Sequence, residues 1–192
     1  TVNIMLLNRI QPKLDTKLRP NQNGFRPKRA TSAHILALRR ILEGVKRKNL
    51  KAVLLFVDFS KAFDSVSWDR LDDTLEGLKI PPEDRRLARN LLRKQSQQVM
   101  TSEGLSQPAW PCCGTAQGAC ESPRIFSWAI EPLLRRLQHH HARDGYQLGH
   151  TTVTALAYAA GIALVSSTAE GLQRQLDTVG DFCKWSGLSV NV

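Results

Sequence analysis

The feature that most constrains the fold is an apolar run that ends on a single carboxylate. Residues 53–57 read Val-Leu-Leu-Phe-Val, and Asp58 follows directly. A short apolar run of this kind predicts a buried strand, here over residues 52–58. A carboxylate at the end of such a strand must be paired, hydrated or bound to a metal. We therefore expect a functional role for Asp58, with the capping of a following helix as the structural alternative.

A second apolar stretch predicts a hairpin over residues 153–166. Two apolar segments flank the tetrapeptide Tyr158-Ala159-Ala160-Gly161. Apolar runs separated by a few turn residues are typical of paired antiparallel strands. Because glycine accepts positive φ, we expect Gly161 to provide the turn conformation.

The remaining chain is dominated by helical periodicity. A further hairpin is predicted over 97–113, with Gly104 near its turn. Apolar residues recur at helical spacing in the segments 3–18, 32–48, 67–78, 83–95, 121–138 and 168–186. A chain of 192 residues can bury one core. We predict one α/β (α+β) domain, with a small antiparallel sheet backed by the last two of these helices.

The chain is strongly basic. Twenty-seven Lys and Arg against 17 Asp and Glu give a net charge of +10. Such a balance favours a polyanionic partner, although solubility alone also accounts for it. Lys46-Arg47-Lys48 fall in the last turn of the predicted helix 32–48, where the helix dipole alone could explain them.

Cysteine, histidine and hydropathy patterns exclude several classes of site. The four cysteines stand at 112, 113, 120 and 183, without the C-x-x-C spacing of a zinc site. We interpret them as reduced thiols of an intracellular protein, nuclear or cytoplasmic. His139-His140-His141 point about 100° apart on a helix and are interpreted as a solvent-exposed helix end. The sequence contains no run of about 18 apolar residues, so no membrane span is predicted.

The two apolar stretches together resemble the palm of reverse transcriptases, above all those of non-LTR retrotransposons. Asp58 matches the aspartate of the family's first palm motif. The family's second motif reads Tyr-Ala-Asp-Asp, and here Ala160 and Gly161 stand in place of its two aspartates. Residues 21–32 are similar to the Gln-x-Gly-Phe-Arg segment of the fingers, and residues 117–123 to the Gln-Gly motif that opens a palm helix.

The resemblance implies roles for particular residues. Asp58 would bind Mg²⁺, together with the Phe59 carbonyl. An aromatic residue at the position of Phe63 would exclude the sugar 2′-OH, although core packing is an alternative for Phe63. Arg26 and Arg29 would lie near template or nucleotide phosphate, unless they are simply solvated. The residues expected to contact the nucleotide are Phe59, Phe63, Gln117 and Gly118.

The resemblance also implies a domain organisation and partners. Residues 1–48 would belong to the fingers and 49–192 to the palm, interrupted by fingers-type helices at about 67–95. The fingers hairpin would precede Thr1 and the thumb would follow Val192, so an incomplete fingers-palm fragment is expected. The implied partners are an RNA template and a DNA primer.

Three functional hypotheses follow. Nucleotidyl transfer needs carboxylates to hold two Mg²⁺ ions, and neither Ala160 nor Gly161 supplies a side-chain oxygen. The first hypothesis is therefore an inactive reverse transcriptase-like domain, and the second is a retained nucleic-acid-binding module. The third is an active polymerase that recruits Asp64 or Glu121, which we disfavour because metal sites tolerate little ligand displacement.

Overall fold

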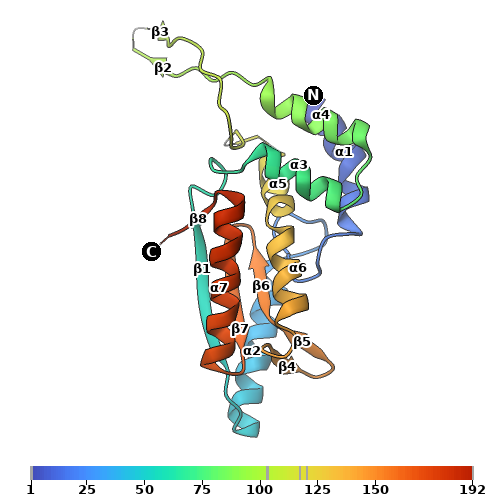
Figure 1. Cartoon of the computed structure of the whole chain (residues 1–192), viewed down its shortest axis with the longest axis vertical. Coiled ribbons are helices and arrows are strands. Elements are labelled where there is room, and N and C mark those ends of the chain that lie inside the picture. The colour runs from blue at the N-terminus through green and yellow to red at the C-terminus, as the bar shows by residue number, and fades with distance from the viewer. Residues whose placement is uncertain (1, 103, 117, 120, 192) are drawn as a thin grey trace.

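The computed structural model describes residues 2–102, 104–116, 118–119 and 121–191 (Figure 1). The helices are α1 (Val2–Asp15), α2 (Thr31–Lys48), α3 (Trp68–Gly77), α4 (Pro82–Arg93), α5 (Ser122–Ala129), α6 (Glu131–His140) and α7 (Ala169–Ser186). The strands are β1 (Val53–Ser60), β2 (Met100–Thr101), β3 (Gly104–Leu105), β4 (Tyr146–Leu148), β5 (Thr151–Val153), β6 (Ala155–Tyr158), β7 (Gly161–Ser166) and β8 (Ser189–Val190).

A four-stranded antiparallel sheet forms the centre of the molecule. Its strand order is β6-β7-β1-β8, and every neighbouring pair is antiparallel. The predicted small sheet, with β1 beside the 153–166 hairpin, is therefore confirmed. The extra strand β8 pairs Val190 with Phe59 and extends the sheet beyond β1.

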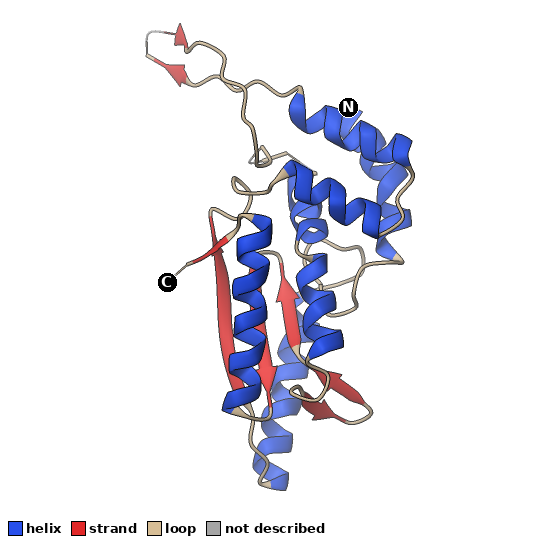
Figure 2. Ribbon diagram, viewed as in Figure 1, coloured by secondary structure: helices blue, strands red, loops and turns tan. Residues whose placement is uncertain are grey.

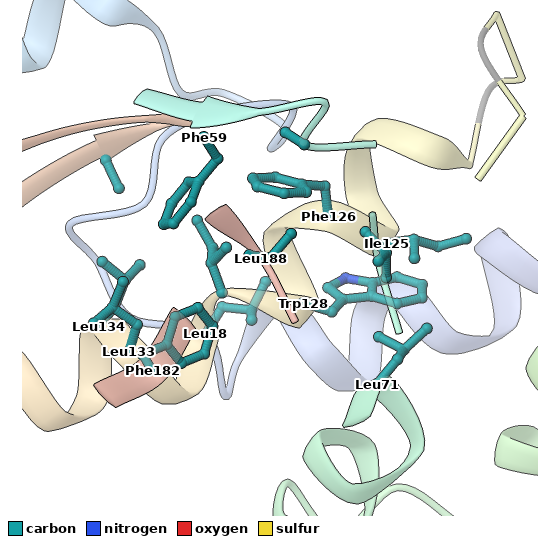
Figure 3. Packing of buried hydrophobic residues seen from close by; sticks show 14 of the residues in the cluster. Leu18, Phe59, Leu71, Ile125, Phe126, Trp128, Leu133, Leu134, Phe182 and Leu188 are labelled. Atoms are coloured by element: carbon teal, nitrogen blue, oxygen red, sulfur yellow. The ribbon is translucent and has the colours of Figure 1, made fainter. Parts of the chain in front are cut away.

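Helices lie on both faces of this sheet (Figure 2). Helix α7 packs across β1 and β7, and α6 packs against β6 and α7. The main core lies on this face and is rich in aromatic side chains, with Phe59, Phe126, Trp128 and Phe182 among its members (Figure 3). Helix α2 lies toward the opposite face, where Ile41 and Leu54 belong to a second, smaller cluster.

Strand β1 is buried on one face only, unlike the predicted buried strand. Val57 and Phe59 are only 4% and 3% exposed, whereas Phe56 is 74% exposed. Successive strand residues point to opposite faces, and the face under α7 is the better covered of the two. Asp58 shares the open face with Phe56 and is exposed.

One helix prediction needs correction. The single helix expected over 121–138 is two helices, α5 and α6, which meet at Ile130. Pro132 explains the break, because proline lacks an N–H and its ring clashes with the carbonyl four residues before it. The predicted helix 32–48 is confirmed as α2, and its apolar stripe is only partly covered: Ile35 and Leu42 are 54% and 55% exposed, whereas Ile41 is fully buried.

Two hairpins lie outside the central sheet. Strands β2 and β3 form the hairpin predicted over 97–113, with Gly104 at positive φ beside the turn, and it projects from the body as an arm (Figure 1). The β4–β5 hairpin was not predicted and packs beside α2. Within the described ranges, no helix has both the length and the apolar character needed to cross a bilayer.

Candidate functional site

The candidate site is centred on Asp58 and the β6–β7 turn. Asp58 stands directly opposite Gly161 across the β1–β7 pair, and Tyr158 pairs with Gly161 across the turn. Directly opposite residues of an antiparallel pair have Cβ atoms about 4.5–5.5 Å apart. A side chain at position 161 would therefore lie beside the Asp58 carboxylate.

The turn adopts a conformation that the sequence did not predict. The residue with positive φ is Ala159, at 54°, and not Gly161, which lies in β7. An ideal Cβ placed on Gly161 meets only the Tyr158 carbonyl oxygen, at 3.6 Å, so there is space for a side chain. Ala160 is partly buried and packs against the main core.

The donors around Asp58 do not form a metal-binding cluster. Among the described residues, no three His, Cys, Asp or Glu side chains converge in a way that could hold an ion. The Asp58 main-chain carbonyl accepts a hydrogen bond from the Asn191 N–H at 2.8 Å, which fixes the strand and leaves the carboxylate at the surface. Glu121, considered as a substitute ligand, is only 5% exposed.

The basic loop after α1 is attached to the edge of the sheet beside the turn. The Ala157 N–H donates to the Asn21 carbonyl at 2.9 Å, and the Asn23 N–H donates to the Ala157 carbonyl at 3.0 Å. This parallel bridge brings Gly24 so close to Ala159 that a Cβ on Gly24 would overlap the Ala159 main-chain nitrogen. Glycine is therefore required where the loop meets the turn.

The two arginines of this loop have different environments. Arg26 is 7% exposed, and its guanidinium donates to the Asp15 carboxylate at 2.8 Å and to main-chain carbonyls of Asp15, Arg19 and Gln22. These bonds fold the loop back onto the end of α1. Arg29 is exposed, although its guanidinium also donates to the Pro20 carbonyl at 2.8 Å.

These bonds bear on the phosphate contacts predicted for both arginines. The described donors of Arg26 are directed into the protein, so the geometry favours a positioning role for this residue. Partial burial, and then the charge of Arg26, lower the pKa of Arg29. The pKa of an arginine in solution is far above neutrality, so Arg29 keeps its positive charge. Arg29 is the better placed of the two for a phosphate, and the contact stays a prediction.

The aromatic residues near Asp58 pack on one helix. The Phe63 ring lies 5.4 Å from that of Phe126 on α5. The Phe59 ring lies 6.2 Å from the Phe126 ring, and Figure 3 shows these two side chains facing each other. Phe59 is fully buried, so only its main chain could meet a nucleotide or an ion. Phe63 is half-buried, so the same ring combines core packing with an accessible edge. Its predicted role in sugar selection is not tested by this packing.

The loop before α5 is only partly described. Gln117 lies outside the described residues, whereas Gly118 has φ +85° and open space around its Cα. The Thr115 N–H donates to the Phe63 carbonyl at 2.9 Å, so this loop runs beside the segment that follows β1. The Ser122 hydroxyl donates to the Ala116 carbonyl at 2.6 Å at the start of α5. The nucleotide contacts proposed for Gln117 and Gly118 stay predictions.

Sequence reasoning missed the side chains that line the open face of the sheet. A cavity of about 470 Å³ lies between α2 and this face, lined by His34, Leu38 and Phe56 as well as Asp58 and Tyr158. Phe56 could have been found, because it stands two residues before Asp58 on the same strand face. His34 could not, since its place follows from the packing of α2. Burial lowers the pKa of His34 from its usual value, which favours the neutral imidazole.

The fold and the site define a class of protein. A small antiparallel sheet with helices on both faces and a carboxylate beside a hairpin turn fits the polymerase palm that the resemblance implied. The sequence matches the reverse transcriptase (RNA-dependent DNA polymerase) family over residues 1–192. The chain therefore belongs to the reverse transcriptase family, which confirms the predicted membership.

Named relatives agree with this assignment. The Pol polyprotein of the type-2 retrotransposable element R2DM from Drosophila melanogaster is 27% identical over 190 residues, 99% of this chain and 18% of the relative. The Pol polyprotein of a type-1 element R2 from Nasonia vitripennis is 28% identical over 149 residues, 76% of this chain and 14% of the relative. The chain thus spans less than a fifth of either relative.

A solved structure shows the same fold. Telomerase from Candida tropicalis, in complex with a TWJ fragment of telomeric RNA, superposes with a TM-score of 0.72 at 12% identity. The match covers 97% of this chain and 32% of the telomerase chain. The predicted mixed fold, with a small antiparallel sheet and helices, is confirmed by this likeness.

Proposed function

We propose that this chain is a reverse transcriptase-like domain of a non-LTR retroelement that has lost nucleotidyl transfer. The observation that carries the proposal is the pairing of Asp58 with Gly161. The resembled family motif has an aspartate at each of positions 160 and 161. Position 161 lies beside Asp58 and has no side chain, and the neighbouring Ala160 offers only a methyl group.

The residues present do not fit the Mg²⁺ ions that the family uses. Mg²⁺ prefers oxygen ligands in near-octahedral geometry, and two ions need shared carboxylates. Asp58 is a single carboxylate at the turn, and the described residues contain no cluster that would complete its ligand set. Asp58 alone would therefore hold neither ion well.

The scaffold around the turn supports retained binding of nucleic acid. The basic loop is bonded to the edge of β6, beside the turn, and the chain carries a net charge of +10. A positive surface of this kind favours a template or primer backbone. We propose an RNA template and a DNA primer as partners, with residues 1–48 as part of the fingers and 49–192 as palm interrupted at about 67–95.

The decisive experiment is primer extension in Mg²⁺ on an RNA template. The native chain is compared with the Ala160→Asp/Gly161→Asp variant, within the longest natural reading frame that contains it. We expect extension only from the variant, faster by several orders of magnitude, as for other central catalytic groups. Adding Asp58→Ala to the variant should abolish its activity.

Other results would change the proposal. Extension by the native chain at a rate close to that of the variant would refute the loss of nucleotidyl transfer and point to a ligand recruited from elsewhere. Extension by neither protein would show that more than the turn has changed. The second candidate function, a nucleic-acid-binding module, would then be favoured by binding that weakens steeply with salt.

A further inference from the structure

A second basic region lies away from Asp58, at the end of α2. A groove of about 950 Å³ separates the C-terminal half of α2 from the β4–β5 hairpin. Figure 1 shows these elements together at the end of the molecule opposite the β2–β3 arm. The groove is lined by Arg40, Lys46, Arg47 and Lys48 from α2 and by Tyr146 and Gln147 from β4.

The walls of this groove are held together by a small core. Tyr146 is 4% exposed and clusters with Ile41 and Val165. Gly44 permits the contact, because a Cβ there would lie 2.6 Å from the Tyr146 hydroxyl oxygen. Leu148 packs against the same cluster. The spacing between helix and hairpin is therefore set by packing and does not depend on a ligand.

The charge of the groove is largely uncompensated. Glu43 is the only acid between residues 30 and 57, and its carboxylate lies 3.2 Å from Arg40. Within the part of the chain that the structure describes, Lys46, Arg47 and Lys48 take part in no ion pair. The same stretch contains six cations: Arg39, Arg40, Lys46, Arg47, Lys48 and Lys51.

Other cationic residues are used differently. Arg9 and Lys13 pair with the buried Asp84, and Arg85 and Arg89 pair with Asp72. Those pairs hold helices together. The helix dipole explains cations in the last turn of α2, but it acts only over that turn and does not explain Arg40 two turns earlier.

We propose that this groove binds the phosphodiester backbone of a nucleic acid, at a site separate from the Asp58 turn. Arg40, Arg47 and Lys48 stand at positions i, i+7 and i+8 and so share one side of the helix. They span about 12 Å along the axis, at about 1.5 Å per residue. That length lets the three side chains contact successive phosphates along one strand.

The test is salt-dependent binding of defined strands. The variant Arg40→Ala/Arg47→Ala/Lys48→Ala is compared with the native chain by fluorescence anisotropy, using labelled 20-nucleotide oligo(U) RNA and oligo(dT) DNA. The matched control is Arg86→Ala/Lys94→Ala/Arg136→Ala, which removes the same charge from exposed residues outside the groove. Circular dichroism checks that both variants fold.

The expected effect follows from counterion release. Each lost phosphate contact lowers the slope of log K against log salt by about 0.7 for single strands, so three contacts lower it by about 2. At 0.1 M salt this corresponds to about a hundredfold weaker binding of the RNA strand, the DNA strand or both. The control should lose much less. RNA-only loss would identify an RNA site, and loss with both strands a backbone site for either.

Two results would overturn the proposal. Equal losses in both triple variants would show that net charge alone governs binding, and an unchanged slope in the groove variant would show that the groove is not used. Neither result depends on catalysis at Asp58. Primer extension by the Ala160→Asp/Gly161→Asp variant tests the proposed function separately, so the two failures are distinguishable.

Discussion

Replacing Gly24 with alanine tests whether the basic loop is held against the β6–β7 turn. An ideal Cβ on Gly24 would overlap the Ala159 nitrogen and lie 3.0 Å from the Ala159 Cα. Both atoms are main chain, so relief requires the loop to move away from the turn. Added atoms at a packed position cost about 1–3 kcal/mol. Loss of one of the two hydrogen bonds that join the loop to Ala157 adds about 1 kcal/mol.

We therefore expect Gly24→Ala to lower the free energy of unfolding by about 2–4 kcal/mol. The measurement is urea denaturation at 25 °C. Gly180→Ala is the matched control, because Gly180 lies within α7 and a Cβ there meets nothing within 4 Å. That change should raise stability by about 0.5–1 kcal/mol. If Gly24→Ala proves as stable as the native chain while Gly180→Ala shifts as expected, the close approach is wrong.

Two further predictions concern ion pairs. Arg26→Ala should destabilise the fold by about 1.5–3 kcal/mol, because the loop loses the charged hydrogen bonds of the guanidinium. Arg29→Ala should cost less than about 1 kcal/mol in the same denaturation assay. The Arg174 guanidinium lowers the pKa of Asp144 from 3.8 to about 2. A depressed pKa stabilises the fold above pH 3.8, and this is lost as pH falls through 2. The full shift corresponds to about 2 kcal/mol and solvent screening at Arg174 reduces it to about 1 kcal/mol, so Asp144→Asn should remove that acid-dependent step in unfolding curves.

The contacts of Asp144 also hold two helices together. The Asp144 carboxylate accepts from His141 at 2.9 Å, and the other His141 ring nitrogen lies 2.8 Å from the Thr178 hydroxyl. These contacts join the end of α6 to α7, the two helices that cover the sheet. Of the three consecutive histidines, His141 is therefore buried, which the interpretation of a solvent-exposed helix end did not anticipate.

Local patterns in the sequence were sufficient for most elements. The apolar run before Asp58 predicted β1, and helical periodicity predicted the helices with shifts of a few residues at their ends. These signals are local, because the spacing at which apolar side chains recur reflects the backbone geometry of a helix or a strand. Pro132, whose effect on the helix was overlooked, is equally local and could have been read from the sequence. Motif resemblance located the Asp58 and Ala160-Gly161 positions without any structure.

Tertiary structure decided what each residue can do. The register that sets Asp58 opposite Gly161 depends on pairing between strands about 100 residues apart, which a local pattern cannot specify. Burial of Arg26, exposure of the apolar stripe of α2 and positive φ at Ala159 likewise depend on contacts between distant segments. The sequence by itself determined the family and its missing carboxylates. Only the packed chain separates the arginine that holds the loop from cations that form no ion pair within the described ranges, because burial and partners are properties of the assembled fold.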